Sequence, residues 1–422
     1  MSILTDNCDK TRKFITEHLT DNIRSLALKA NTYKDINISF ALDQIAGWQK
    51  ACIKLPSWAN IQGIIYPKHI SLEQCSSEVT ATYKYHLVRR IIGSSDGEKV
   101  TLSTSLLDLT GGFGVDFSFM ARAFDKAVYV EQQEELCEIA QYNFDLFHYE
   151  RTLIEIVNAE CINYLHITDP VTVIFIDPAR RDYNGGKTVF ISDCSPNIIP
   201  IEEELLLKAQ YVVIKLSPML DWHKAATDLC SVGDVVREVH ILSVKNECKE
   251  LLLVLQSEEK ARLLGLSSSN MKMFCINDDQ VVSFSIEEAK NAVLRLFTEQ
   301  LQIGMYLYEP NSSLMKAASF GVITQKYPVS ALAPNSHLFV SFDEIANFPG
   351  RSFVITGFSS FNKKSLKRFL SGLSKANIAT RNFPQTVSEL RKRLKLSEGG
   401  KDYLFATTLI NGEHYMIKCA KI

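Results

Sequence analysis

The chain has 422 residues, of which 46% are hydrophobic and 22% charged, and its net charge is −2. These values are typical of a soluble globular protein large enough for two or three cores. Ten scattered cysteines without a Cys-x-x-Cys pair argue against a disulfide framework and a zinc site. No apolar stretch reaches the roughly 18–20 residues of a membrane span, and residues 1–13 are mostly polar. We therefore expect a cytoplasmic protein without membrane or metal partners, and the sequence leaves its oligomeric state open.

Helical spacing dominates the start of the chain. Apolar residues recur every three or four positions in residues 11–29 and 39–53. A third helix is expected from Leu72 to Leu87. Its Ser76 and Lys84 are expected to face the start of the following sheet. We favour a plain packing role for them over a role in a lid on a ligand site.

The segment from Leu106 to Asp116 carries the most information. An apolar run ends at Asp108, closely spaced glycines follow, and an amphipathic stretch begins at Phe117, which predicts a strand, a tight turn and a helix. Glycine permits positive φ and lets a ligand lie against bare backbone. Such a turn after the first strand of an open α/β sheet binds nucleotide-like ligands. The spacing is not that of a dinucleotide fingerprint: it is acid-x-Gly-x-Gly-x-Gly, with Thr110 in the first glycine position. An ordinary strand-to-helix turn is the alternative.

Three later landmarks favour a ligand site. Glu131 ends a second short strand 23 residues after Asp108, where an acid would hold ribose hydroxyls. A third strand, Leu153–Val157, leads to Ala159 and Glu160. An almost wholly apolar run, typical of a strand buried on both faces, ends in Asp177-Pro178-Ala179-Arg180-Arg181. Four acids in this order are not expected by chance.

The glycine turn resembles motif I of class I S-adenosylmethionine (SAM)-dependent methyltransferases, and Asp177 begins a segment in the position of their motif IV. The resemblance implies that SAM is the cofactor and that nine residues bind it: Asp108, Thr110, Gly111, Gly112, Gly114, Asp116, Glu131, Ala159 and Glu160. It implies a catalytic role for Asp177, Pro178 and Arg180, and Arg181 and Lys215 are assigned to the substrate.

Motif IV also limits the acceptor atom. In methyltransferases of the Asn/Asp-Pro-Pro-aromatic type, the first side chain and a proline carbonyl accept hydrogen bonds from an exocyclic amine. Here Arg180 replaces the aromatic residue, and arginine can stack on a base or bind a phosphate bidentately. An adenine amine, a guanine amine and a ring nitrogen all stay open. Carbon methylation is disfavoured, because the next cysteine, Cys194, lies 17 residues after Asp177 and outside any Pro-Cys motif.

The tail extends the resemblance to the whole chain. Its elements are Asn382-Phe383-Pro384, Leu394-Lys395-Leu396, Gly399-Gly400 and Tyr403 to Thr407. Together with the two motifs they resemble a family of bacterial candidate SAM-dependent methyltransferases. These proteins carry a small ferredoxin-like insert and a THUMP-like C-terminal domain, and THUMP domains in general accompany RNA-modifying enzymes.

We therefore expect an α/β protein: a Rossmann-like class I methyltransferase sheet, an N-terminal helical region and a smaller α+β C-terminal domain. The expected regions are 1–96 (helical), 97–258 (methyltransferase), 259–348 (connector with a ferredoxin-like element) and 349–422 (THUMP-like). Within them, Gln210–Leu216 is a predicted fifth strand and Ile286–Leu301 a long amphipathic helix. Asn411-Gly412 predicts a hairpin between Tyr403–Leu409 and Glu413–Cys419.

Charge is unevenly spread along the chain. Residues 351–422 contain fourteen Lys and Arg but four Asp and Glu. Lys and Arg supply most of the sequence-independent affinity for nucleic acid. We expect a methyltransferase acting on a base nitrogen of RNA (tRNA or rRNA) bound through the basic C-terminal domain. The alternatives are a methyltransferase of a small molecule or protein, and a catalytically silent RNA-binding factor.

Overall fold

The computed structural model describes residues 8–33, 35–93, 103–180, 190–230, 233–257, 259–260 and 271–422. The chain forms two compact units, the first made of Met1–Arg237 with Glu250–Ser269 and the second of Glu238–Lys249 with Asn270–Ile422. The four-region division stays a prediction. None of the helices in the described ranges is long and apolar enough to cross a membrane.

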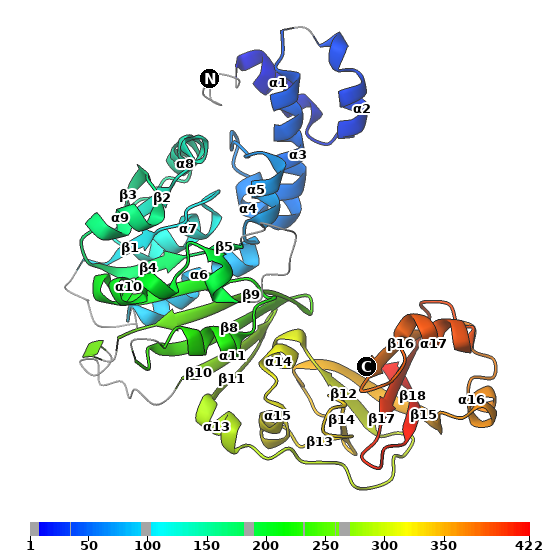
Figure 1. Cartoon of the computed structure of the whole chain (residues 1–422). Helices are drawn as coiled ribbons and strands as arrows, with labels where there is room; N and C mark the ends of the chain where they lie inside the picture. Colours follow the sequence, from blue (N-terminus) through cyan, green and yellow to red (C-terminus); the bar gives the residue numbers. More distant parts are fainter. Residues whose placement is uncertain are drawn as a thin grey trace. The chain divides into compact units, whose positions relative to one another are not determined.

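The first unit begins with six helices (Figure 1). They are α1 (Asp9–His18), α2 (Ile23–Leu28), α3 (Ile38–Lys54), α4 (Pro56–Ala59), α5 (His69–Gln74) and α6 (Glu78–Ile91). The single helix predicted over 72–87 is wrong: the chain breaks after Gln74, and Ser77 caps α6 by accepting a hydrogen bond from the Thr80 amide at 3.3 Å. The break places Gln74, Cys75 and Ser76 in the wall of a cavity described below.

The sheet of the first unit follows, with strands in the order β9-β7-β4-β1-β2-β3. They are β1 (Ser105–Asp108), β2 (Lys126–Glu131), β3 (Leu153–Asn158), β4 (Val171–Ile176), β7 (Ala209–Leu216) and β9 (Glu247–Leu255). The first five are parallel, and β9 runs antiparallel to β7. The chain lays β2 and β3 on one side of β1 and β4 on the other, so the order reverses at β1. Ligands of open α/β sheets bind beside such a reversal, at the carboxyl ends of the strands.

Short helices connect these strands. They are α7 (Val115–Met120), α8 (Glu134–Leu146), α9 (Cys161–Ile167), α10 (Glu202–Lys208) and α11 (Trp222–Asp228). Helix α6 packs against α7, so the N-terminal region contacts the helix that follows the glycine turn. The core there is aromatic: Trp58 is buried against Phe113 and Phe147, with ring centroids 4.9 and 4.8 Å away.

The second unit contains β8 (Val236–Val244), β10 (Lys272–Asn277) and β11 (Gln280–Ser285), and a seven-stranded sheet in the order β13-β14-β12-β15-β18-β17-β16. The seven strands are β12 (Tyr306–Pro310), β13 (Ser330–Ala331), β14 (Phe339–Ser341), β15 (Gly350–Ser360), β16 (Asn377–Arg381), β17 (Asp402–Thr408) and β18 (His414–Lys421). Its helices are α13 (Ile286–Asn291), α14 (Ser312–Ala317), α15 (Phe320–Lys326), α16 (Lys363–Phe369) and α17 (Val387–Leu394). The predicted hairpin is confirmed: β17 pairs antiparallel with β18, and Gly412 at the turn has φ +81°.

The long helix predicted over 286–301 is wrong. Helix α13 ends at Asn291, and residues 292–301 are not helical. Phe297 donates its amide to the Ala331 carbonyl, and Ala331 returns a bond to the carbonyl of Arg295, both at 2.8 Å. Phe297 thereby joins the core under the seven-stranded sheet. This tertiary pairing satisfies the backbone and buries the aromatic ring, which outweighs the helical spacing of the sequence.

Candidate functional site

A cavity of about 490 Å³ lies at the carboxyl ends of β1, β2, β3 and β4 in the first unit. Its wall includes the whole of Asp108 to Asp116, the segment Glu131–Gln133, Ala159 to Ile162, Asp177 and Lys215. Every predicted cofactor residue is therefore in this wall, although the residues are spread over three strand ends and the loops after them. These residues come together because the carboxyl ends of parallel strands lie at the same edge of the sheet.

The glycine turn is shaped by close neighbours. Gly112 and Gly114 have φ angles of +55° and +80°, in the region that glycine adopts without strain. Gly111 instead needs space, because a Cβ there would lie 2.2 Å from the ring of Tyr129. Its amide donates to the Val130 carbonyl at 2.8 Å, and the Tyr129 hydroxyl donates to the Gly112 carbonyl. Strand β2 thus holds the turn against the sheet.

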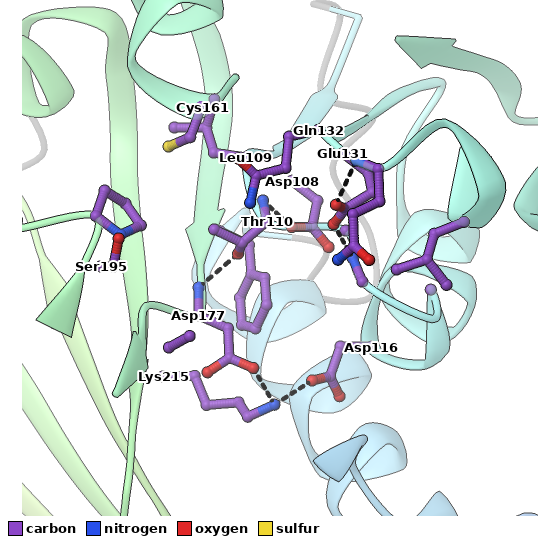
Figure 2. A pocket seen from close by; sticks show the side chains of 18 of the residues that line it. Asp108, Leu109, Thr110, Asp116, Glu131, Gln132, Cys161, Asp177, Ser195 and Lys215 are labelled. Carbon is purple, nitrogen blue, oxygen red and sulfur yellow. Dashed lines mark hydrogen bonds and ion pairs between the residues drawn. The ribbon is translucent and has the colours of Figure 1, made fainter. Parts of the chain in front are cut away.

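Glu131 fixes the turn from the end of β2. One carboxylate oxygen accepts from the Gly112 amide and the other from the Gln133 amide, both at 2.9 Å (Figure 2). Each oxygen keeps a second acceptor site, so the carboxylate can still accept hydrogen bonds from a ligand. At the next strand end, Ala159 donates its amide to the Glu131 carbonyl, and Glu160 caps α9 through the Asn163 amide.

Asp108 and Thr110 connect the turn to motif IV. The Asp108 carboxyl is buried and accepts from the Thr110 amide at 3.0 Å. Burial raises the pKa of Asp108 to about 8, against the lowering effect of that hydrogen bond. The Thr110 hydroxyl accepts from the Asp177 amide at 2.7 Å. Glycine has no hydroxyl, so the departure from the commoner motif supplies a contact between β1 and β4.

Lys215 lies between two acids (Figure 2). From the last residues of β7, its ammonium lies 2.6 Å from Asp177 Oδ2 and 2.9 Å from Asp116 Oδ2. Burial lowers the pKa of Lys215, but Asp116 and then Asp177 outweigh it and hold the pKa well above its usual range. Burial raises the pKa of Asp116, but Lys215 and then Lys84 outweigh it and hold the value at about 2. The Asp177 side chain is 36% exposed, whereas that of Asp116 is 9% exposed.

A second buried ion pair lies behind Asp116. The ammonium of Lys84, on α6, is fully buried, contacts Glu250 of β9 and lies 3.1 Å from Asp116 Oδ1. The Ser76 hydroxyl lies 2.8 Å from Asp116 Oδ2 and 2.9 Å from Glu250 Oε1, and can donate its one hydrogen to one of them at a time. Both ammonium groups reach the same hydroxyl, Lys84 at 3.1 Å and Lys215 at 3.2 Å. We call Ser76, Lys84, Asp116, Asp177, Lys215 and Glu250 the charge cluster.

The sequence did not identify the charge cluster as a unit. Ser76 and Lys84 were expected to pack near the sheet, and Glu250 had no predicted role. The structure assembles them from a helix break, a helix and an antiparallel strand. The only sequence signal was the presence of ionisable residues in otherwise apolar surroundings, such as Glu250 before a run of five Leu and Val residues.

Motif IV forms another part of the wall. Pro178 is buried, and the backbone of Ala179–Arg180 forms the short strand β5, which pairs antiparallel with β6 (Cys194–Ser195). Ser195, Pro196 and Asn197 line the cavity, which the sequence did not predict because the segment has no periodic pattern. The side chain of Arg180 and the whole of Arg181 lie outside the described residues. Within those residues, no group of three or more His, Cys, Asp or Glu could hold a metal ion.

Comparisons with known proteins bear on both units. Residues 306–349 match the family model of a ferredoxin-like domain, and residues 350–421 match that of a THUMP domain-like family. No curated protein matches the sequence. The chain is similar to a protein of Porphyromonas gingivalis W83 that is described as a candidate methyltransferase. The TM-score is 0.81 and the identity 28%, over 98% of this chain and 97% of that one.

Two further solved structures are similar to part of the chain. One is a candidate RNA methyltransferase of Pyrococcus horikoshii, with 12% identity, 48% of this chain and 95% of that chain covered, and a TM-score of 0.34. The other is M. capricolum TrmK with S-adenosyl-homocysteine, with 11% identity, coverages of 42% and 68%, and a TM-score of 0.30. Only the first of the three similarities extends over the whole chain.

These findings confirm the expected fold class and the resemblance. A Rossmann-like methyltransferase sheet, an N-terminal helical region and a smaller C-terminal domain with ferredoxin-like and THUMP-like parts occur in one chain. The coarse function that they support is methyl transfer.

Proposed function

We propose that this protein, which has a class I methyltransferase fold and a THUMP-like C-terminal domain, uses SAM to methylate a nitrogen of a base in RNA. The observation that carries the proposal is the cavity at the reversal of strand order, where a glycine turn and two strand-end acids face an aspartate-proline motif. When bound, SAM supplies a methyl group that is already activated on a sulfonium, so the chain mainly has to align the acceptor.

The residues present fit that cofactor. The cavity volume lies in the range of small-molecule sites, roughly 300–1,000 Å³, and the glycine turn offers backbone rather than side chains. We assign the ribose hydroxyls to Glu131 and the adenine amine to Glu160. The bond from the Gly112 amide to Glu131 ties the turn to the acid, so both elements of the cofactor site are held in place together.

We assign the acceptor amine to Asp177 and the Pro178 carbonyl. The Asp177 carboxylate is the most exposed acid of the charge cluster, and it is held from both ends, by Thr110 at its amide and by Lys215 at Oδ2. A carboxylate fixed in this way can accept a hydrogen bond from an amine and direct its lone pair. Arg180 and Arg181 follow directly in sequence, and we assign both to the RNA.

The basic C-terminal region supports RNA as the substrate. Nine Lys and Arg side chains between residues 363 and 401 are exposed: Lys363, Lys364, Lys367, Arg368, Lys375, Lys392, Arg393, Lys395 and Lys401. Exposed cations attract phosphates without sequence preference. This surface and the THUMP-like match favour RNA over a small molecule or a protein.

Mass spectrometry of modified nucleosides tests the proposal. We expect one methylated nucleoside to be missing from the tRNA or rRNA of a deletion strain and to be restored by the purified protein with SAM. If all nucleosides are unchanged while the protein binds SAM, a small-molecule or protein substrate replaces RNA. If the protein fails to bind SAM at micromolar concentrations, a catalytically silent role replaces the proposal.

A further inference from the structure

The charge cluster has an uneven number of charges. It contains three carboxylates (Asp116, Asp177 and Glu250) but two ammonium groups (Lys84 and Lys215), so one negative charge is in excess when all five are ionised. Unbalanced charge is costly in a poorly hydrated site. The most exposed carboxylate, which has the fewest partners, therefore carries the excess most readily.

Asp177 is that carboxylate. Asp116 and Glu250 each contact an ammonium group and the Ser76 hydroxyl, and both are at most 9% exposed at the side chain. Asp177 contacts Lys215 alone among these groups, and its side chain is 36% exposed in the cavity wall. The excess charge thus lies where a substrate would arrive.

We propose that Lys84 and Glu250 are positioning residues that set the charge balance of the cluster and leave its excess negative charge on Asp177, which takes the proton released by the methylated nitrogen. The inference rests on the proposed function. As the new N–C bond forms, the electron pair of the broken S–C bond stays on sulfur, and the nitrogen gives up one proton. A carboxylate beside the nitrogen accepts that proton without any further reactant.

Ionisable side chains on four other elements face Asp177. They are Lys215 on β7, Asp116 on α7, Glu250 on β9 and Asp108 on β1. Burial raises the pKa of Asp177, Lys215 lowers it, and Asp116 and Glu250 raise it further. Lys84 contacts both Asp116 and Glu250, so it offsets their effect.

This arrangement predicts opposite effects for two variants. Lys84→Met removes a positive charge and should move the acid limb of the kcat profile of methyl transfer to higher pH, by about 0.5–1 unit. Glu250→Gln removes a negative charge and should move it to lower pH by a similar amount. The double variant Lys84→Met/Glu250→Gln restores the original imbalance and should return the limb to its wild-type position. A purely structural role would lower activity without opposite shifts.

A second measurement does not depend on activity. In an Asp177→Cys background, the rate of alkylation of that thiol at each pH, followed by peptide mass spectrometry, reports its pKa. We expect Lys84→Met to raise that pKa and Glu250→Gln to lower it, and Glu250→Gln keeps the shape of the side chain if Lys84→Met fails to fold. Shifts of the same sign, or no shift in either variant, would overturn the inference even if RNA methylation is confirmed. If the predicted pKa shifts are seen but the protein does not methylate RNA, the inference about the charge cluster holds and only the proposed function is refuted.

Discussion

The charge cluster of the first unit and the basic helices α16 and α17 of the second both depend on ionised side chains, but at opposite exposures. In the cluster, Lys84 is fully buried and Lys215 is 10% exposed at the side chain, and each contacts two carboxylates. On α16, Lys363, Lys364 and Lys367 are exposed. Buried pairs hold a geometry and are costly to break, whereas exposed charges act at longer range and are screened by salt. The buried charges of the first unit thus fix the geometry of a site, whereas the exposed charges of the second unit are suited to attract a charged partner.

The largest effect is expected from Asp177→Ala. The change removes the carboxylate that we assign to the acceptor nitrogen, so kcat for methyl transfer should fall by about 10²–10⁴-fold. Binding of SAM, measured by calorimetry, should change little because the glycine turn and Glu131 are untouched. Asp169→Ala, an exposed acid just before β4, is the matched control and should keep activity. Full activity of Asp177→Ala would refute the assignment.

Charge reversal on α16 tests the role of the exposed lysines. With Lys363, Lys364 and Lys367 all changed to Glu, affinity for RNA at low salt should fall by roughly 10–100-fold. The slope of log affinity against log salt should also decrease by about 2. SAM binding should be unaffected, and Lys29→Glu, at an exposed position of the first unit, should change neither quantity. An unchanged slope would show that these lysines of α16 do not contact RNA.

Asp108 gives a smaller effect that depends on pH. Because burial raises its pKa to about 8, the folded state binds a proton that the unfolded state releases near pH 4. Stability should therefore decrease as pH rises from about 4 to 8, by at most about 1.4 kcal/mol per pH unit from this group. Asp108→Asn keeps an oxygen for the Thr110 amide and should flatten that slope in urea unfolding at pH 5.5 and 7.5. An identical slope in both proteins would contradict the shift.

Thr110→Val is expected to have the smallest effect. It removes the acceptor of the Asp177 amide while keeping the branched shape, and should cost about 1 kcal/mol of stability. Because Asp177 is then held less firmly, the variant should lower kcat more than it changes KM. Thr110→Ser keeps the hydroxyl and should retain both values. Equal kinetics for the Val and Ser variants would show that the hydroxyl does not position Asp177.

The sequence was sufficient to predict the positions of the strand-end acids, because there the local sequence pattern and the geometry of a parallel sheet agree. Asp108 and Glu131 end short strands and Asp177 directly follows one, and parallel strands bring their ends to one edge. Tertiary partners carry no such pattern: Lys84 has the spacing of an ordinary helix residue, yet its ammonium contacts a carboxylate 166 residues away. The helix predicted over 286–301 failed for the same reason, because the partner of Phe297 lies on a distant strand.

The sheet of the first unit depends on the helices that precede it in the chain. Helix α6 precedes the sheet, and its Lys84 provides a counter-charge for Asp116 and Glu250. A fragment that starts at β1 would contain both acids without that ammonium and without the Ser76 hydroxyl. We expect such a fragment to be expressed poorly or to need acidic conditions to fold, so the N-terminal helices must be retained when the first unit is engineered or joined to another module.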